Sequence, residues 1–573
     1  MIFKKILTAL FFSCLFFPVY SQQNYRFPLD RTLSMSANFG ELRTNHFHAG
    51  IDLRVGGASG AKVYAIEAGH VSRIYVSGTG YGKALYIEHP DGHTSVYAHL
   101  DRFAGKIAEY VEEYQYKRQR FHVNDYTDTT LLPVKKGDLI GYAGNTGSSF
   151  GAHLHFEIRE SQLQAPLNPV TKGYITPNDN IPPKFHRVAI FTLDTINDVT
   201  RPRLLKSETM VKKTKNYAPE KTSTFEVCNP IFIGINANDY QPENTSRHGI
   251  YQMKAYLDNE LFYSFNMDGF EFKYTKYINS FIAFDELTDN KITYIKTYIE
   301  DGNKIPFYKS IKNKGLIILK DTLPHNVKIE LFDDLQNKST AEFRIRKSAK
   351  VATKHQTVNP AQFITMNRNI AFEYYEDSLE VYIEPESLYS NALFKASKTG
   401  TPAGAYSTLW NFGYENIPLH NLMKLKIKPA ELPSHLREHA FIARQNKKDE
   451  DISHCGGRFD TSGFLVTDVS SFGSYFIAVD TVPPRVSVKS KSNSFSAASK
   501  LTVTLDDNIS GIKSCDGYID GEWVLFEHDP KTKSMTYTFS QKQMGVKGKK
   551  RQLKVVATDN CNNNTEFLYE FIY

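Results

Sequence analysis

Two short stretches of the chain bring together side chains that commonly bind metals. His46, His48 and Asp52 lie within HFHAGIDL, and His153 and His155 lie within GAHLHFEI. In a strand, residues i and i+2 point to one face, so the last two imidazoles are expected to project together. Two imidazoles and one carboxylate would make an open zinc site, because catalytic zinc keeps one position for water. The spacing alone leaves the choice of ligands open.

Short β-type runs between turns must position these side chains. Residues 36–176 contain glycine-rich turns such as SGTGYGK and KKGDLIGYAGNTGSS, separated by runs such as ALYIEH and TSVYAHL. This pattern predicts a compact antiparallel sheet domain. One stretch differs. In AGKIAEYVEEYQYKRQR, the apolar residues Ile107, Val111 and Tyr114 recur at i, i+4 and i+7, which predicts an amphipathic helix.

Three motifs in a fixed order resemble a known family. HFHAGIDL, the run from VYAIEAGH to SVYAHL, and VKKGDLIGYAGNTGSSFGAHLHFEIR are similar to the lysostaphin/LytM-type peptidases of family M23. These enzymes are zinc endopeptidases that cleave peptidoglycan cross-bridges. The resemblance covers residues 36–160, about a quarter of the chain. It implies one Zn²⁺ per chain and hydrolysis of the stem peptides or cross-bridges of peptidoglycan.

The resemblance also implies a role for each chemical group. The family's metal ligands fall on His48, Asp52 and His155, and its two non-ligand catalytic histidines fall on His99 and His153. Zinc lowers the pKa of bound water and polarises the scissile carbonyl. The two free imidazoles can take a proton from that water and hydrogen-bond the developing oxyanion. The division of these tasks between the two imidazoles stays open.

Other candidate residues receive no such role. His46 could share a strand face with His48, but the motif does not need it. His89 and His93 flank a PDG turn and are predicted to be solvated. The tyrosine that some relatives place before the first ligand has no counterpart in SANFGELRTNHFH. HLREH, residues 435–439, matches the inverted zincin pattern, but its β-rich surroundings favour a chance match.

The N-terminus and the overall composition indicate the compartment. Lys4 and Lys5 precede an apolar run that ends in Val19-Tyr20-Ser21, so residues 1–21 are predicted to be a secretory signal peptide. No later stretch is long and apolar enough to predict a transmembrane helix. The formal charge of +7 is mild for 573 residues, so nothing favours a nucleic-acid partner. The predicted location is the periplasm, the cell envelope or the extracellular space.

Two Asp-x-x-Pro-Pro segments, in DNIPPKF and DTVPPRV, predict domain boundaries because consecutive prolines cannot continue a strand ladder. The fold class is predicted to be mainly β. A LytM-type peptidase domain at 22–180, with a helical insertion at about 101–132, precedes β-sandwich domains at 181–350 and 351–480 and an immunoglobulin-like domain at 481–573. The insertion is longer than the family's usual connection, and it would form a wall of the substrate groove or cover it.

Two further features are left as alternatives. Cys515 and Cys561 lie near turns of the last segment, where they either form a disulfide or stay free thiols.

The leading functional hypothesis is an exported zinc endopeptidase for cell-wall remodelling, with the sandwiches contacting a cell-envelope protein. The alternative is a non-hydrolytic peptidoglycan-binding scaffold or an activator of another hydrolase. Degenerate relatives of that kind lose ligands, whereas all five positions are present here. A third hypothesis is a protein or peptide substrate.

Overall fold

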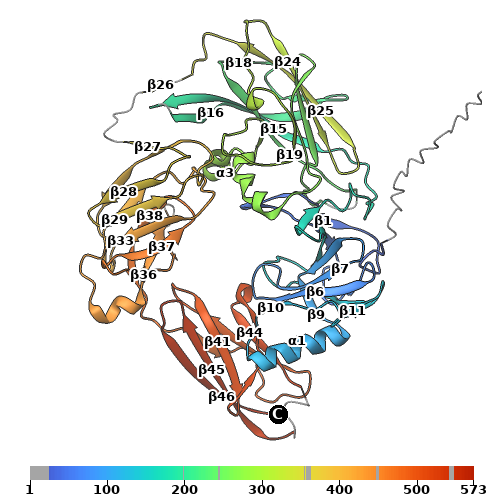
Figure 1. Ribbon diagram of the computed structural model, residues 1–573, viewed down its shortest axis with the longest axis vertical. Helices are drawn as coiled ribbons and strands as arrows, with labels where there is room; N and C mark the ends of the chain where they lie inside the picture. Colours follow the sequence, from blue (N-terminus) through green and yellow to red (C-terminus); the bar gives the residue numbers. More distant parts are fainter. Residues whose placement is uncertain are drawn as a thin grey trace, which may run out of the picture.

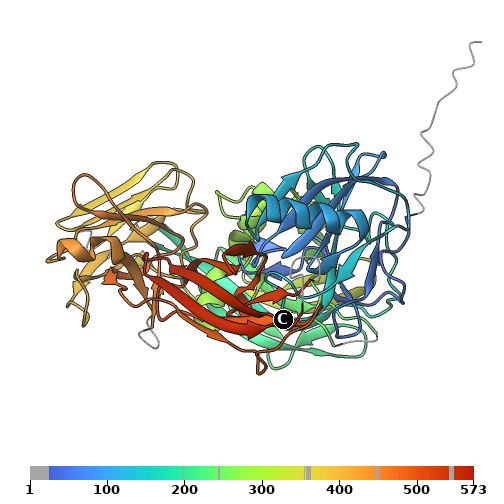
Figure 2. The ribbon, with the colours of Figure 1, turned by 90° about the horizontal axis from the view of Figure 1, so that it is seen from below.

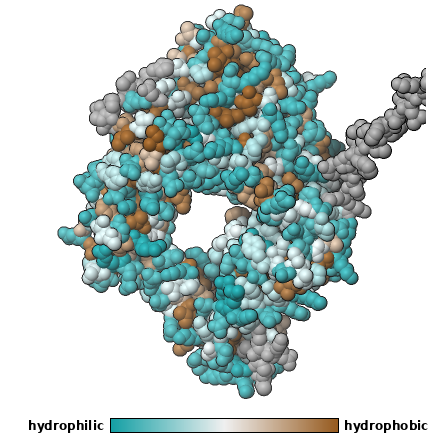
Figure 3. Space-filling view, viewed as in Figure 1, coloured by the Kyte–Doolittle hydropathy of each residue, from teal (hydrophilic) through white to brown (hydrophobic). Residues whose placement is uncertain are grey.

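The computed structural model describes residues 25–573 except 198, 243–244, 354, 357–362, 447–450 and 541–546, with the side chains of 355–356 also left out. The predicted signal peptide lies outside the described residues. Four β-rich lobes follow one another around a central opening, as the ribbon and the space-filling view show (Figure 1, Figure 3). No helix among the described residues is long and apolar enough to cross a membrane. The prediction of a mainly β fold is confirmed.

The N-terminal lobe, residues 25–175, is built on an antiparallel sheet. Its strand order is β1 (Met35–Ala37), β4 (Ile51–Arg54), β13 (His153–Glu160), β8 (His93–Ala98), β7 (Lys83–Glu88), β6 (Gly69–Val76) and β10 (Val123–Tyr126), with β11 (Pro133–Val134) beside β6 and β14 (Ala165–Leu167) beside β13. A second sheet has the order β5 (Lys62–Tyr64), β12 (Leu139–Ala143) and β9 (Leu100–Phe103). A small hairpin pairs β2 (Leu42–Arg43) with β3 (His46–Phe47).

The predicted amphipathic helix is confirmed as α1 (Gly105–Arg118). Ile107 and Val111 are buried, and α1 contacts β9, β10 and β12. The end of the helix faces the C-terminal lobe, where the Tyr116 ring meets Trp523 edge-on at 5.4 Å between centroids. The insertion therefore takes part in a contact between lobes.

The second lobe, residues 184–347, packs directly against the N-terminal lobe. Its 12-stranded sheet has the main order β22 (Ile295–Lys296), β19 (Ile231–Asn238), β15 (Lys184–Ile196), β16 (Val199–Lys212), β17 (Tyr217–Pro219), β25 (Lys338–Lys347), β24 (His325–Phe332), β20 (Gln252–Leu257), β21 (Glu260–Asn266) and β23 (Tyr308–Ile311). Two further strands, β18 (Thr224–Val227) and β26 (His355–Gln356), pair with β25 and β15, and short helices include α2 (Ile278–Phe281) and α3 (Phe284–Asn290). One hydrophobic cluster includes Leu29 of the N-terminal lobe and Ile345 of the second lobe, so these two lobes share a core.

The third lobe, residues 364–479, has two five-stranded sheets. One has the order β28 (Phe372–Glu376), β29 (Leu379–Ile383), β33 (Met423–Ile427), β37 (Leu465–Val469) and β36 (Arg458–Phe459). The other has the order β31 (Ala396–Thr399), β32 (Leu409–Phe412), β38 (Gly473–Val479), β34 (Ala440–Gln445) and β35 (Ile452–His454). A separate pair joins β27 (Ile364–Met366) to β30 (Ala392–Phe394). Residues of both large sheets, such as Leu425 and Trp410, share one buried cluster, which is the arrangement of a sandwich.

The C-terminal lobe, residues 485–572, has two four-stranded sheets. Their orders are β39 (Arg485–Val488), β40 (Lys500–Asp506), β44 (Ser534–Thr538) and β43 (Glu527–Asp529), and β42 (Glu522–Val524), β41 (Ile512–Ile519), β45 (Lys550–Asp559) and β46 (Asn564–Ile572). A single cluster again unites the two sheets. Cys515 and Cys561 are both free thiols, so of the two alternatives the disulfide is not formed.

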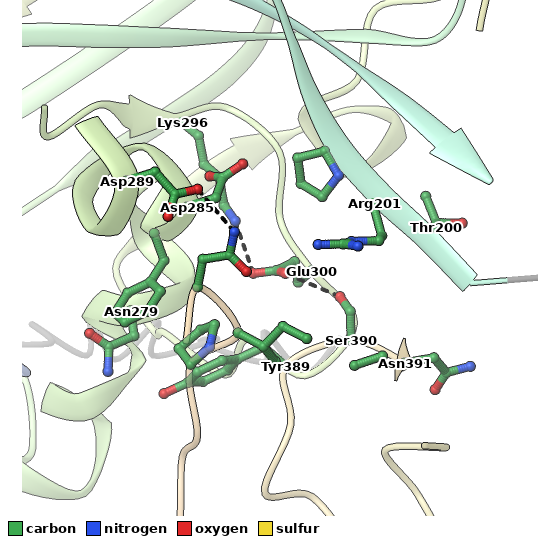
Figure 4. A pocket seen from close by; sticks show the side chains of 16 residues that line it. Thr200, Arg201, Asn279, Asp285, Asp289, Lys296, Glu300, Tyr389, Ser390 and Asn391 are labelled. Carbon is green, nitrogen blue, oxygen red and sulfur yellow. Dashed lines mark hydrogen bonds and ion pairs between the residues drawn. The ribbon is translucent and has the colours of Figure 1, made fainter. Parts of the chain in front are cut away.

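A pocket lies where the second lobe meets the third (Figure 4). Glu300 accepts hydrogen bonds from Ser280, Lys296 and Ser390, and the last of these residues comes from the third lobe. Asn416 of the third lobe donates to Asp289 at 3.0 Å. Polar groups of the two lobes therefore satisfy one another across this pocket, which holds the ring together at this point.

The ring closes where the C-terminal lobe contacts the N-terminal lobe, and the view from below shows it reaching towards α1 (Figure 2). Lys83 Nζ pairs with Glu527 at 2.7 Å. Lys531 Nζ donates to the carbonyl oxygens of Asn145 and, at 3.0 Å, of Ser149. The HLREH residues form an exposed 3-10 helix, η4 (Ser434–His439), instead of the long helix that a zincin motif requires.

Candidate metal centre

Strand pairing brings the predicted site residues together. Strand β13 lies between β4 and β8, and in this register His155 faces Asp52 on one side and Ala98 on the other. Directly opposed residues have Cβ atoms about 4.5–5.5 Å apart. His99 follows Ala98 at once, and Leu154 on the opposite face of β13 is fully buried in the core. The alternation of a strand thus separates the chemical face from the apolar face.

Three ligand atoms form a small triangle. His48 Nε2 lies 3.1 Å from Asp52 Oδ1 and 3.0 Å from His155 Nδ1, and the latter two atoms are 2.9 Å apart. His48 is 6% exposed, Asp52 8% and His155 4%. The structure therefore brings together the three residues that the family resemblance assigned as ligands.

The loop that carries His48 is held in place by the second lobe. Phe47, 1% exposed, packs against a group of rings from that lobe, Phe270, Phe281 and Phe307. The Asn38 side chain donates to Gly249 O at 3.0 Å and accepts from Gly249 N at 2.7 Å. The Asn38 carbonyl in turn accepts the Nδ1 proton of His48 at 2.7 Å. This bond fixes the tautomer that leaves Nε2 free for a metal.

A buried carboxylate fixes the second imidazole. His155 Nε2 donates to Glu157 Oε1 at 2.8 Å, which leaves Nδ1 as the ligand atom. Glu157 is fully buried and also accepts from Arg159 Nε at 2.6 Å and from the Tyr81 hydroxyl at 2.5 Å. Burial alone would raise the pKa of Glu157, but the Arg159 charge lowers it to about 2. The carboxylate is therefore ionised behind the imidazole.

The two remaining histidines lie beside the triangle. His99 Nδ1 donates to Thr146 O at 2.9 Å, and His153 Nδ1 donates to Gly151 O at 2.8 Å. Both rings thus keep an unprotonated Nε2, and their centroids lie 4.9 Å apart. His153 Nε2 reaches to 3.4 Å from Asp52 Oδ1. His99 adopts φ 60°, and its ring centroid lies 5.7 Å from that of His155.

Without a metal ion His155 is protonated and His99 is neutral at ordinary pH, and both states follow from burial and from the neighbouring groups. Burial would raise the pKa of Asp52, but the neighbouring His48 and the close contacts with His153 and His155 hold that pKa well below its usual range. Burial lowers the pKa of His99 to about 3, helped by the nearby imidazoles. Burial also lowers the pKa of His155, but its bonds to Asp52 and Glu157 outweigh burial and raise it to about 9. His99 is therefore neutral at ordinary pH.

The donor set fits zinc. Tetrahedral bonds of about 2.0–2.1 Å place ligand atoms roughly 3.3 Å apart, close to the 2.9–3.1 Å triangle found here. Each imidazole offers the nitrogen that its other hydrogen bond leaves free, as zinc ligands require. With three protein ligands the site is of the open, catalytic type.

Two predictions about neighbouring histidines have different outcomes. His46 is exposed and bonds Thr44 O at 2.8 Å, in agreement with a residue outside the site. The prediction that His89 is solvated is wrong. It is 3% exposed, because its two ring nitrogens bond Ala68 O at 2.9 Å and Ser95 Oγ at 2.8 Å. These two hydrogen bonds offset the free-energy cost of burying the polar imidazole of His89.

Sequence reasoning missed the residues that orient the ligands. Asn38 acts through its backbone carbonyl, for which side-chain spacing carries no signal. The sequence did carry a signal for Glu157 and Arg159, because i+2 alternation from His155 places both side chains on the face of β13 that carries the histidines. Arg43 also contacts the site, with Nη2 at 3.3 Å from Asp52 Oδ2.

Comparison with known proteins agrees with this geometry. Residues 46–117 and 113–169 match peptidase family M23. The fold and the site thus define a peptidase family M23 domain in the N-terminal lobe. Residues 362–480 match a Zu5-like domain, which corresponds to the third lobe.

The relatives share only this part of the chain. The DD-carboxypeptidase/endopeptidase Mpg of Neisseria meningitidis serogroup B is 32% identical over 136 residues, covering 24% of this chain and 25% of that protein. A metalloprotease of Haemophilus influenzae is 28% identical over 152 residues, 26% of each chain. The chain therefore spans about a quarter of the length of the curated relatives it matches. The catalytic domain of lysostaphin from Staphylococcus simulans is 23% identical, covering 25% of this chain and 93% of that one, with a TM-score of 0.19.

Proposed function

We propose that this protein is an exported, zinc-dependent endopeptidase that hydrolyses peptide cross-links of peptidoglycan. The observation that carries the proposal is the triangle of His48, Asp52 and His155 with two further imidazoles, His99 and His153, beside it. The Neisseria relative is a DD-carboxypeptidase/endopeptidase, which supports peptidoglycan as the substrate. Export to the periplasm or cell envelope is supported by the signal-like sequence of residues 1–21.

His48, Asp52 and His155 would hold one Zn²⁺ per chain. When bound, zinc supplies Lewis-acid polarisation of the scissile carbonyl and lowers the pKa of a water molecule. Glu157 keeps His155 oriented and makes it a stronger electron donor, because its ionised carboxylate accepts the Nε2 proton. The Asn38 carbonyl does the same for His48 through Nδ1.

His99 and His153 perform the proton transfers and bind the oxyanion. Each ring donates Nδ1–H to a backbone carbonyl, of Thr146 and Gly151 respectively, so each presents a basic Nε2 to the site. A neutral imidazole can take the proton from the attacking water and then, as imidazolium, hydrogen-bond the oxyanion or protonate the leaving amine. Burial and the nearby imidazoles lower the pKa of His99 to about 3, so protonation of His99 depends on the negative charge that develops during reaction.

The experiment is digestion of purified sacculi by the mature chain, with mass analysis of the released muropeptides. His48→Ala is expected to lose both zinc and turnover, because it removes a ligand. His153→Ala is expected to lose turnover but keep zinc, because it is not a ligand. His46→Ala is the matched control and should keep both, since its ring is exposed and bonds only Thr44 O.

The outcomes separate the alternatives. Wild-type protein that binds sacculi and zinc but releases no fragments would refute the endopeptidase proposal and favour a peptidoglycan-binding scaffold. Turnover of isolated peptides without release from sacculi would favour a peptide substrate. Release that persists in His153→Ala would refute the role assigned to that imidazole.

A further inference from the structure

The two Asp-x-x-Pro-Pro junctions belong to a larger repeated pattern. Asp179 precedes β15 and Asp480 precedes β39, the first strands of the second and C-terminal lobes. In each lobe that strand pairs antiparallel with a strand that is followed directly by another aspartate, Asp239 after β19 and Asp507 after β40. A third aspartate lies where the last hairpin of the lobe turns. The three aspartates of each lobe are Asp179, Asp239 and Asp333, and Asp480, Asp507 and Asp559.

The hairpin turn of the second lobe holds its aspartate tightly. Asp333 Oδ1 accepts from Leu335 N at 2.9 Å and from Asn337 N at 2.8 Å, while Oδ2 accepts from Asn337 Nδ2 at 2.7 Å. The same Asn337 amide donates to the backbone carbonyl of Asp179 at 3.2 Å. The turn and the Asp-x-x-Pro-Pro junction are therefore tied to each other.

The C-terminal lobe repeats these bonds one for one. Asp559 Oδ1 accepts from Cys561 N at 2.8 Å and from Asn563 N at 2.9 Å, and Oδ2 accepts from Asn563 Nδ2 at 2.8 Å. Asn563 Nδ2 also donates to Asp480 O at 2.8 Å. The same arrangement of carboxylates thus arises twice in one chain, from sequence segments that share only a few residues.

The carboxylates of the second-lobe triad are buried close together and are incompletely hydrogen-bonded. Asp179, Asp239 and Asp333 each offer one carboxylate oxygen, and these oxygens lie within 4.8 Å of one another. Asp239 is 3% exposed and Asp333 2%. Asp239 Oδ1 is buried without a hydrogen-bond partner among the described residues. The counterpart oxygen, Asp507 Oδ1, is likewise buried and unpartnered in the described part of the chain.

Physical chemistry favours an ion at such a place. Buried carboxylates are normally paired, hydrogen-bonded or bound to a metal. Here three carboxylate oxygens crowd together at a buried place, and one of them has no hydrogen-bond partner among the described residues. A divalent cation between them would balance their charges.

We propose that Asp179, Asp239 and Asp333 bind Ca²⁺ at the junction of the N-terminal and second lobes. The triad offers only hard oxygen ligands and no histidine or cysteine, which selects against zinc. Ca²⁺ accepts carboxylate oxygens in flexible geometry, whereas Mg²⁺ demands near-octahedral geometry and usually keeps several waters, so a cluster of buried carboxylates suits Ca²⁺ better. Asp334, the residue after Asp333, accepts a hydrogen bond from the Asn38 side chain at 3.2 Å, so an ion at the triad would help to hold Asn38 in position.

The test is calcium titration of the full-length chain after chelation, by calorimetry and by thermal unfolding. Asp239→Asn keeps the shape of the site but removes the charge of the unpartnered carboxylate. This variant should bind one Ca²⁺ fewer per chain than wild type, and calcium should raise its unfolding temperature less. Asp301→Asn, at an exposed position of the same lobe, is the matched control and should behave as wild type.

Three results would overturn the proposal. Wild type and Asp239→Asn could take up the same number of calcium ions. Calcium could fail to shift the unfolding temperature of wild type, a measurement that does not depend on any variant folding. Magnesium at equal concentration could stabilise wild type as much as calcium. In the absence of calcium Asp239→Asn should be at least as stable as wild type, because it removes a buried charge from two others, and this shows that the variant folds.

Discussion

Replacing Glu157 with glutamine tests whether the charge of this carboxylate strengthens zinc binding through His155. The glutamine oxygen can still accept the Nε2 proton of His155, but the negative charge behind the imidazole is lost. Removing such a partner typically lowers metal affinity 10–100-fold, which corresponds to about 1.4–2.7 kcal/mol. Glu157→Gln is therefore expected to weaken zinc binding by that factor in a chelator competition assay.

The same substitution has a second and larger effect on stability. Arg159 is 5% exposed and forms its ion pair with Glu157. Its other contacts are the Tyr81 hydroxyl at 3.3 Å and the faces of the Tyr86 and Phe272 rings. Leaving a buried charge without its partner costs about 3–5 kcal/mol. Zinc-free Glu157→Gln should therefore unfold at lower denaturant concentration, whereas Glu157→Gln/Arg159→Met should recover most of the stability without recovering zinc affinity.

Glu160→Gln is the matched control on the same strand, since that carboxylate accepts from the backbone N–H groups of Gln162 and Leu163 and does not contact the site. It should bind zinc as wild type does. Zinc affinity within twofold of wild type in folded Glu157→Gln would refute the reasoning. So would recovery of zinc affinity in the double variant, because the loss would then come from the distorted fold and not from the imidazole.

Three further predictions concern the surroundings of the site. Burial lowers the pKa of His99 from 6.5 to about 3, so between these pH values the unfolded chain binds a proton that the folded chain does not bind. As the pH falls from 6.5 to 3, the free energy of unfolding of zinc-free protein should therefore decrease by up to about 1.4 kcal/mol per pH unit. Denaturant titrations of His99→Asn should show a shallower decrease. Gly147→Ala should lower the free energy of unfolding by about 1–3 kcal/mol and reduce turnover, because Gly147 has φ +72° and an added Cβ would lie 2.3 Å from Gly80 O. Gly151→Ala is the control, because its Cβ would meet nothing within 4 Å, and it should be nearly neutral in the same assays. Lys531→Ala should speed hydrogen exchange in residues 145–151 while changing stability by less than about 1 kcal/mol, since the contact is at the surface; unchanged exchange would show that this contact does not hold the loop.

Local patterns in the sequence predicted much of the fold and the centre of the site. The i, i+4, i+7 spacing located α1, and i+2 alternation located His153 and His155 on one strand, because both follow from backbone periodicity alone. The choice of His48, Asp52 and His155 as ligands came from the family resemblance. Residues 101–132 could be predicted to form an insertion, but not to reach the C-terminal lobe. That contact joins Tyr116 to Trp523, which are far apart in the chain.

What local patterns could not predict are the contacts that the other lobes make with the site. The carbonyl that orients His48 belongs to Asn38, whose side chain is clamped by Gly249 of the second lobe. Ser149 and Asn145, on the loop before His153, accept hydrogen bonds from Lys531 of the C-terminal lobe. The lobes outside the M23 match are thus in physical contact with both edges of the site. A change of lobe position, such as one caused by the calcium proposed at Asp179, Asp239 and Asp333, would reach His48 through Asn38 without altering any residue of the candidate site.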